Sequence, residues 1–119
     1  MRDKGFEGEI VIVGEEPHPP HQRPPLSKQY LSGEQAIDRV YLRPQKFYDD
    51  KDVNLVLNTS ATAIDRDNKN VTLSSGDSVD YDKLIIATGS RPRILNIEGS
   101  DLEGIHYLRT IGDVDAIRE

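Results

Sequence analysis

Two short runs of aliphatic residues mark the chain, and each is closed by a glycine. The first extends from Glu9 to Gly14, with Ile10 to Val13 continuously β-branched, and the second is Leu84 to Ala87, closed by Gly89. Runs of this kind are typical of strands covered on both faces in a parallel sheet. Val53 to Leu57 is a third strand candidate. Three such strands imply an α/β fold with helices on both sides of the sheet.

The chain from about residue 60 to 81 follows a different pattern. Short alternating segments are separated by two clusters of turn residues, which is typical of antiparallel hairpins. We therefore expect a three-stranded antiparallel β-meander over 60–81. Its strands would be Ala61 to Ile64, Val71 to Leu73 and Val79 to Tyr81, with turns at Asp67 to Asn70 and Ser75 to Asp77.

Prolines and glycines limit where helices can form. Five prolines, at positions 17, 19, 20, 24 and 25, exclude regular structure between the first strand and Leu26. A proline is acceptable in the first turn of a helix, and a glycine commonly ends one. The remaining pattern predicts helices at Leu26 to Leu31, Pro44 to Asp52 and Gly112 to Glu119, and a short strand at Ile105 to Leu108.

Composition restricts the partners of the chain. Its 119 residues include 15 Lys and Arg against 21 Asp and Glu, for a net charge of −6, and the basic residues are scattered. A nucleic-acid partner would require a basic patch or stripe. No apolar run reaches the ~18 residues of a membrane helix, and the sequence starts without a signal peptide. We expect no nucleic-acid partner, no membrane attachment and a cytoplasmic location.

Metal and thiol chemistry find little support in the sequence. The chain has no cysteine, which excludes thiolate zinc sites and dithiol redox centres within these residues. His18 and His21 lie in a proline-rich stretch that cannot align them, so we expect no metal site. Asp65 and Asp67 resemble the opening of a calcium loop, but Lys69 occupies a ligand position, and we expect a hairpin turn instead. No catalytic constellation is evident, and redox chemistry would need a bound cofactor.

Three positions carry candidate binding chemistry. Glu15 follows the first apolar strand, where a carboxylate can accept hydrogen bonds from both hydroxyls of a ribose, although a strand-ending glutamate can equally be a solvated side chain. Arg23 and Lys28 lie five residues apart at a helix start and suit a pyrophosphate or the edge of a flavin. Thr88 and Gly89 form a turn that a ligand could approach closely. The proline segment around Arg23 also fits a polyproline ligand of SH3-like domains.

The strings GFEGEIVIVGEEPHPPHQRPPLSKQYL, YDKLIIATGSRPR and GIHYLRT, with the meander between them, give the chain a family resemblance. It resembles the FAD-dependent pyridine-nucleotide oxidoreductases of the ferredoxin reductase type. The resemblance implies hydride transfer from NAD(P)H to FAD and single-electron delivery to an iron-sulfur or rubredoxin-type acceptor. It also implies a Rossmann-like FAD-binding domain. Carried over residue by residue, its cofactor-binding positions are Glu15, Arg23, Lys28, Ala61, Thr88 and Gly89.

The sequence departs from that family at its beginning. We expect residues 1–119 to be a partial FAD-binding domain lacking the first strand and the GxGxxG phosphate loop, with the nicotinamide domain also absent. Losing about three charge-assisted hydrogen bonds, at roughly 1.5–3 kcal/mol each, predicts weak or undetectable FAD binding. Without the nicotinamide domain, we expect no activity of these residues alone. His21 and Ala61 differ from the residues usual in the family.

Two further expectations follow from this departure. A sheet without its central strand exposes apolar edges, so self-association is expected. The alternative function is a folded, non-catalytic remnant that binds a protein through its proline segment or its open edge.

Overall fold

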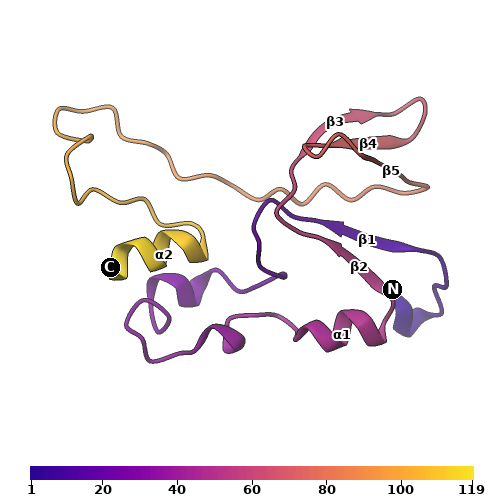
Figure 1. Cartoon of the computed structure of the whole chain (residues 1–119), viewed down its shortest axis with the longest axis horizontal. Coiled ribbons are helices and arrows are strands. Elements are labelled where there is room, and N and C mark those ends of the chain that lie inside the picture. The colour runs from indigo at the N-terminus through magenta and orange to yellow at the C-terminus, as the bar shows by residue number, and fades with distance from the viewer. The chain divides into compact units, whose positions relative to one another are not determined.

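The computed structural model describes residues 1–119, which divide into two compact units (Figure 1). Unit 1 comprises Met1–Pro20 and Arg43–Ile86, and unit 2 comprises His21–Leu42 and Ala87–Glu119. The elements in chain order, with 3-10 helices written η, are η1 (Arg2–Lys4), β1 (Ile10–Val13), η2 (Pro24–Ser27), η3 (Ile37–Arg39), α1 (Gln45–Asp50), β2 (Val53–Val56), β3 (Ala61–Asp65), β4 (Asn70–Leu73), β5 (Ser78–Asp80) and α2 (Ile111–Arg118).

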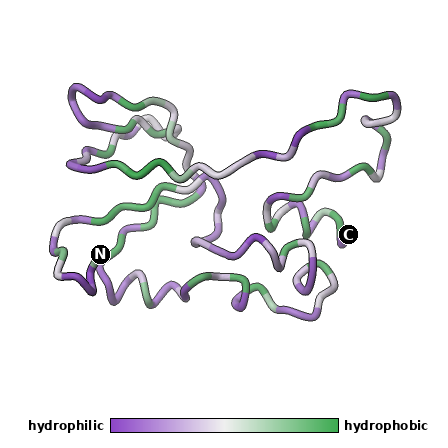
Figure 2. The backbone as a smooth tube through the Cα atoms, turned by 180° about the vertical axis from the view of Figure 1, so that it is seen from behind, coloured by the Kyte–Doolittle hydropathy of each residue, from purple (hydrophilic) through white to green (hydrophobic).

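Unit 1 contains a two-stranded parallel sheet. β1 pairs with β2 from Ile10 opposite Val53 to Val13 opposite Val56, which confirms the first and third predicted strands. Figure 2 shows both strands as predominantly hydrophobic. All four residues of β1 are half-buried. The prediction that β1 is covered on both faces is therefore wrong. The α-helix of this unit, α1, packs against β2, the neighbouring strand.

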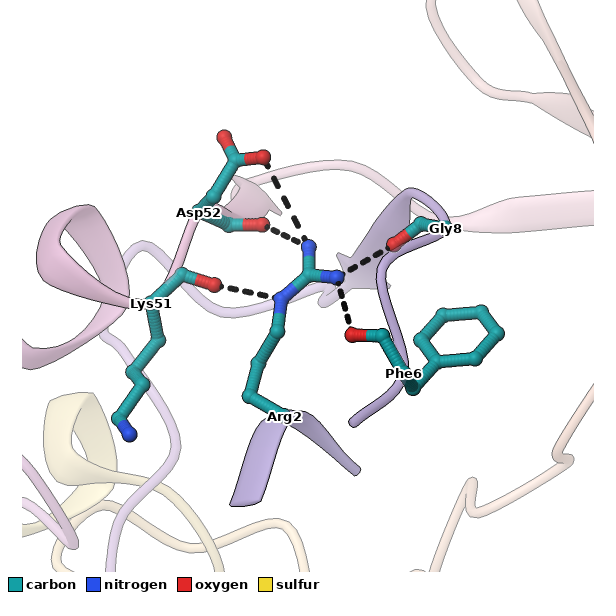
Figure 3. Close-up of polar contacts among 5 residues, drawn as sticks. All are labelled: Arg2, Phe6, Gly8, Lys51 and Asp52. Carbon is teal, nitrogen blue, oxygen red and sulfur yellow. Dashed lines mark hydrogen bonds and ion pairs between the residues drawn. The ribbon is translucent and has the colours of Figure 1, made fainter. Parts of the chain in front are cut away.

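One arginine ties the start of the chain to the turn between α1 and β2 (Figure 3). The Nε of Arg2 donates to the carbonyl of Lys51 at 2.8 Å, and its Nη2 donates to the carbonyl of Asp52 at 2.8 Å. The Nη1 donates to the carbonyls of Phe6 and Gly8 at 2.8 and 2.7 Å. The guanidinium thus joins the segments that lead into β1 and β2, whose register it helps to set.

The predicted β-meander is present in unit 1. β3, β4 and β5 form an antiparallel sheet in that order, within a residue or two of the predicted bounds. The Oδ1 of Asp65 accepts from the backbone N–H groups of Asn68 and Asp67 at 2.9 and 3.0 Å. These bonds, with the amide of Asn68 first among them, lower the pKa of Asp65. The expected hairpin turn is confirmed, and the Asp65 carboxylate closes it.

Unit 2 has the larger buried cluster. Leu26, Tyr30 and Val40 come from the proline-rich half of the unit and pack with Ile111 and Val114 of α2. The N-terminus of α2 is held by a capping box, which the predicted helix start at Gly112 misses by one residue. Core formation therefore places η2 against α2, two segments far apart in the sequence.

Three predicted elements are wrong. Leu84 to Ala87 is extended but belongs to no strand, and Ile85 and Ile86 are 77% and 67% exposed. The reason is that neither sheet places a strand beside this run, and an extended segment becomes a strand only by pairing. Ile105 to Leu108 lacks a partner for the same reason. The predicted helix at Leu26 to Leu31 is instead η2 followed by turns, because two prolines occupy the first positions of a tighter 3-10 helix.

None of the helices has the length and the apolar character that a membrane span requires.

Candidate functional site

Glu15 lies at the carboxyl end of β1, in unit 1. Its neighbour Gly14 accepts a hydrogen bond from the N–H of Thr59 at 2.9 Å, and Glu16 accepts one from the N–H of Asn58 at 3.1 Å. These two bonds extend the β1–β2 pairing past the ends of both strands. Glu15 is thereby fixed between them, with its residue exposed. Ligands of open α/β sheets bind outside the carboxyl ends of the strands, which is where this carboxylate lies.

Ala61 begins β3, just after the loop that those two bonds hold. It pairs with Leu73, and a register shift lies between Ala61 and Ala63. The N–H of Ser74 donates to the carbonyl of Ser60 at 2.8 Å. Ala61 is exposed. Both predicted site residues of unit 1 thus follow the carboxyl ends of its two parallel strands and remain accessible.

Arg23 and Lys28 flank η2 in unit 2. Arg23 is the residue before the helix, and its Nη1 donates to the carbonyl of Arg109 at 2.8 Å. Pro24 and Pro25 fix the backbone between the two cations, and Pro25 is buried. Lys28 ends the 3-10 helix and is exposed. The two predicted cations therefore have different surroundings: one is anchored to a distant turn and the other is open to solvent.

Gly89 lies against the side chain of the same arginine. Its φ is +70°, in the left-handed region that favours glycine. A Cβ at this position would lie 2.6 Å from the Nη2 of Arg109. Thr88, the other residue of this predicted turn, is exposed. The structure thus brings Arg23 and Gly89 together through Arg109, whose carbonyl contacts one and whose guanidinium contacts the other.

Asp113 holds the turn that contains Arg109. Its Oδ2 accepts from the N–H groups of Arg109 and Thr110 at 2.8 and 2.7 Å, while the Oγ1 of Thr110 accepts from the N–H of Asp113 at 3.1 Å. Burial acts to raise the pKa of Asp113, but these hydrogen bonds and the nearby charge of Arg23 outweigh it, so that the pKa is lowered. The carboxylate is therefore held ionised beside the cation.

Two concavities of the surface lie elsewhere. One, of about 570 Å³, is lined by residues at the amino ends of the parallel strands, among them Ile10 and Val53. The other, of about 640 Å³, lies on the meander and includes Ile64 and Thr72. Neither is lined by any of the six predicted site residues. Open α/β sheets bind their ligands at the carboxyl ends of the parallel strands, whereas the first concavity lies at the amino ends.

Arg109 and Asp113 are the residues that the sequence analysis missed. Arg109 lies within the string GIHYLRT, which contributed to the resemblance but was given no role. A signal for Asp113 was available, because Thr110 and Asp113 have the spacing of a capping box just before an apolar position. That pattern predicts a rigid turn at Arg109.

Comparison with known proteins identifies the family of this chain. The sequence model of the pyridine nucleotide-disulphide oxidoreductases matches residues 1–119. The chain belongs to this family. The resemblance to its ferredoxin reductase type is confirmed by the relatives. Rhodocoxin reductase of Rhodococcus erythropolis is 43% identical over 117 residues, which is 98% of this chain and 27% of that protein. Putidaredoxin reductase CamA of Pseudomonas putida is 41% identical, over 99% of this chain and 29% of its own length.

Solved structures agree with the fold. Putidaredoxin reductase in its covalent complex with putidaredoxin superposes with a TM-score of 0.87 at 41% identity, over 98% of this chain and 29% of that chain. A ferredoxin reductase from Rhodopseudomonas palustris gives a TM-score of 0.90 at 35% identity, over the same shares. The α/β fold with a Rossmann-like part and a meander is confirmed. The chain spans less than a third of the length of these relatives.

The residues present fit a dinucleotide such as FAD. Glu15 offers an exposed carboxylate at the carboxyl end of a parallel strand, the position that suits a ribose. Arg23, Lys28 and Arg109 offer three cations, which suit phosphate groups. Gly89 presents backbone without a side chain beside one of these cations. Taken separately, unit 1 therefore offers a carboxylate that suits a ribose, and unit 2 offers cations that suit phosphate.

Proposed function

We propose that this chain forms part of the FAD-binding domain of a flavoprotein reductase that passes electrons from NAD(P)H to a ferredoxin or rubredoxin-type acceptor. The observation that carries the proposal is the cluster of Arg23, Gly89 and Arg109, in which one arginine anchors the turn and a second lies against a glycine with positive φ. The names of the relatives, which include reductases for rhodocoxin, putidaredoxin and rubredoxin, support the proposed acceptor class.

Each residue has a defined task in this proposal. Glu15 accepts hydrogen bonds from a ribose, while Lys28, Arg23 and Arg109 neutralise phosphate oxygens. Thr88 and Gly89 let the ligand approach the backbone closely, and Ala61 lines the adenine side. FAD, when bound, supplies the electron-transfer chemistry, and the protein supplies position and charge. None of these side chains is needed as an acid, base or nucleophile.

The affinity of residues 1–119 for FAD is expected to be low. No GxGxxG stretch occurs among them, so the backbone donors of a phosphate loop are not available from this chain. The cations of unit 2 must then supply most of the phosphate binding. We propose that residues 1–119 are a partial FAD-binding domain and that other protein segments complete the site in the working reductase.

The proposal is tested by a flavin fluorescence titration of the 119-residue chain. Lys28→Ala is compared with Lys46→Ala, a control that removes an exposed lysine of α1 whose Nζ pairs with Asp50 at 2.6 Å. We expect the Lys28 variant alone to weaken FAD binding, by about tenfold for the loss of one charge-assisted hydrogen bond. Equal affinities in the two variants would contradict the assignment of Lys28 and, with it, this arrangement of the site.

We also propose that the chain self-associates. The support is the extended apolar run ending at Ile86, which has no strand beside it, and the two open edges of the β1–β2 sheet. Unpaired apolar backbone of this kind favours pairing with a second copy. Analytical ultracentrifugation should give a concentration-dependent dimer, which Ile85→Lys should weaken. A monodisperse monomer over the full concentration range would contradict this proposal.

The polyproline alternative is disfavoured by the structure. A ligand of SH3-like domains needs an exposed, extended proline segment. Here Pro24 and Pro25 belong to η2, and Pro25 and Leu26 are buried. Pro25 and Leu26 are therefore part of the folded core of unit 2, and neither can enter the groove of a partner without unfolding that core.

A further inference from the structure

We propose that Asp113 is a positioning residue for the phosphate-binding cations, acting through the turn at Arg109. This inference rests on the proposed FAD site and extends it to a residue that does not itself touch the ligand. The carboxylate accepts hydrogen bonds from the N–H groups of Arg109 and Thr110. The same turn presents the Arg109 carbonyl to the Nη1 of Arg23.

The geometry makes one carboxylate responsible for two cations. If Asp113 releases the N–H of Thr110, which shares its peptide plane with the Arg109 carbonyl, that carbonyl loses its fixed direction and Arg23 loses a defined acceptor. The Nη2 of Arg109 lies 2.6 Å from the position that a Cβ of Gly89 would occupy, so a shift of the turn also changes the contact between this cation and the glycine. Both cations thus depend on a residue that bears the opposite charge and that holds the backbone of the turn between them.

An acidic residue at this position is otherwise unfavourable for an anion site. Its charge would repel phosphate oxygens unless the carboxylate were turned toward the protein. Here its Oδ2 is occupied by two backbone donors, and the half-buried Asp113 lies near the charge of Arg23. The carboxylate therefore orders the cations while its hydrogen-bonded oxygen faces the backbone.

The test compares Asp113→Asn with Asp115→Asn in the 119-residue chain. Asp115 lies on the same helix and accepts a hydrogen bond from the hydroxyl of Tyr30 at 2.8 Å, so its loss perturbs α2 without touching the Arg109 turn. In 15N–1H spectra without ligand, we expect the amide resonances of Arg109 and Gly89 to shift in the Asp113 variant only. In FAD titrations we expect about tenfold weaker binding for that variant and unchanged binding for the control.

The outcomes separate this inference from the proposed function. Unmoved Gly89 and Arg109 resonances in Asp113→Asn, or equal loss of FAD affinity in the two variants, would overturn the positioning role. Shifted resonances together with FAD binding that neither Lys28→Ala nor Asp113→Asn weakens would instead overturn the proposed site, and the positioning role toward FAD with it. A further check starts from the double variant Arg23→Met/Arg109→Met. Adding Asp113→Asn to it should cause no additional loss of affinity for FAD.

A measurement on the unsubstituted chain covers the case in which Asp113→Asn does not fold. The charge that acts on the pKa of Asp113 is that of Arg23, and the Asp113 carboxylate supplies the hydrogen bonds that hold the turn. During an acid titration, the amides of Arg109, Thr110 and Gly89 should therefore shift with one common midpoint, below the ordinary carboxyl value of 3.8. A Gly89 amide that does not follow the other two would overturn the inference.

Discussion

The guanidinium of Arg23 and the carbonyl of Arg109 are joined by a 2.8 Å hydrogen bond between residues 86 positions apart in the sequence. The bond closes unit 2 on itself, because Arg23 precedes η2 and Arg109 precedes α2. The buried residues beneath it come from the same two segments. Binding chemistry and core packing in this unit therefore depend on one another, and core variants should affect both.

Leu26→Ala should strongly destabilise the chain. Leu26 is 1% exposed and lies in the core between η2 and α2. Truncation of a buried leucine costs about 3 kcal/mol, from lost burial and the cavity left behind. Urea unfolding measures the change, with Leu102→Ala as the control, since Leu102 is 66% exposed. A control variant as unstable as Leu26→Ala would show that this core is not where the structure places it.

Tyr30→Phe should have a smaller effect on the free energy of unfolding. The variant keeps the buried ring but removes the hydroxyl that donates to the Oδ1 of Asp115 at 2.8 Å. We expect a loss of about 1 kcal/mol, the usual value for one hydrogen bond. Tyr81→Phe is the matched control, because its exposed hydroxyl only reaches the carbonyl of Asp65 at 3.5 Å. Identical urea midpoints for the two variants would contradict the structure of this contact.

Arg2→Met should destabilise unit 1. The side chain of Arg2 is only 17% exposed and donates to four backbone carbonyls around the entries to β1 and β2. Methionine keeps the aliphatic stem but leaves these carbonyls without the guanidinium, so we expect a loss of about 2 kcal/mol. Hydrogen exchange of the β1 and β2 amides measures the loss locally. Arg66→Met, at an exposed position of the β3–β4 turn, should leave their exchange unchanged.

The stability of the chain should fall in acid partly through Asp113. Burial raises the pKa of this carboxyl, but the N–H groups of Thr110 and Arg109 lower the pKa by a larger amount. The native pKa therefore lies below the ordinary value of 3.8. The unfolded chain then binds the proton more readily. The contribution of Asp113 is thus complete above pH 3.8 and is lost as the pH falls through the native pKa.

Comparison with Asp113→Asn isolates this contribution, because Asp3 and Asp65 also have lowered pKa values and titrate in the same range. The free energy of unfolding, measured by urea from pH 7 to pH 3, should decline less steeply in the variant. Parallel curves for the two proteins would show that Asp113 is not held ionised by its surroundings.

Local pattern was sufficient for much of the fold. The runs at β1 and β2, the alternation in the meander and the residues of α1 and α2 carry local signals, so these elements could be predicted from the sequence, although the capping box that starts α2 was overlooked. The run at Leu84 to Ala87 could not, because its side chains favour a strand but pairing depends on a neighbour that neither sheet provides. The candidate site shows the same limit. Arg23 was predicted from its motif, whereas the role of Arg109 depends on a contact made by the folded chain.

The central claim, that this chain carries part of an FAD site, is tested most directly by mapping FAD binding with 15N–1H spectra. Titration to about 1 mM detects affinities too weak for other methods. Riboflavin serves as the control, because it lacks the phosphates and the adenosine. With FAD we predict saturable shifts at the amides of Glu15, Ala61, Gly89 and Arg109, and with riboflavin we predict none at Arg109. Shifts confined to the concavities near Val53 and Thr72, or no shifts at all, would contradict the claim.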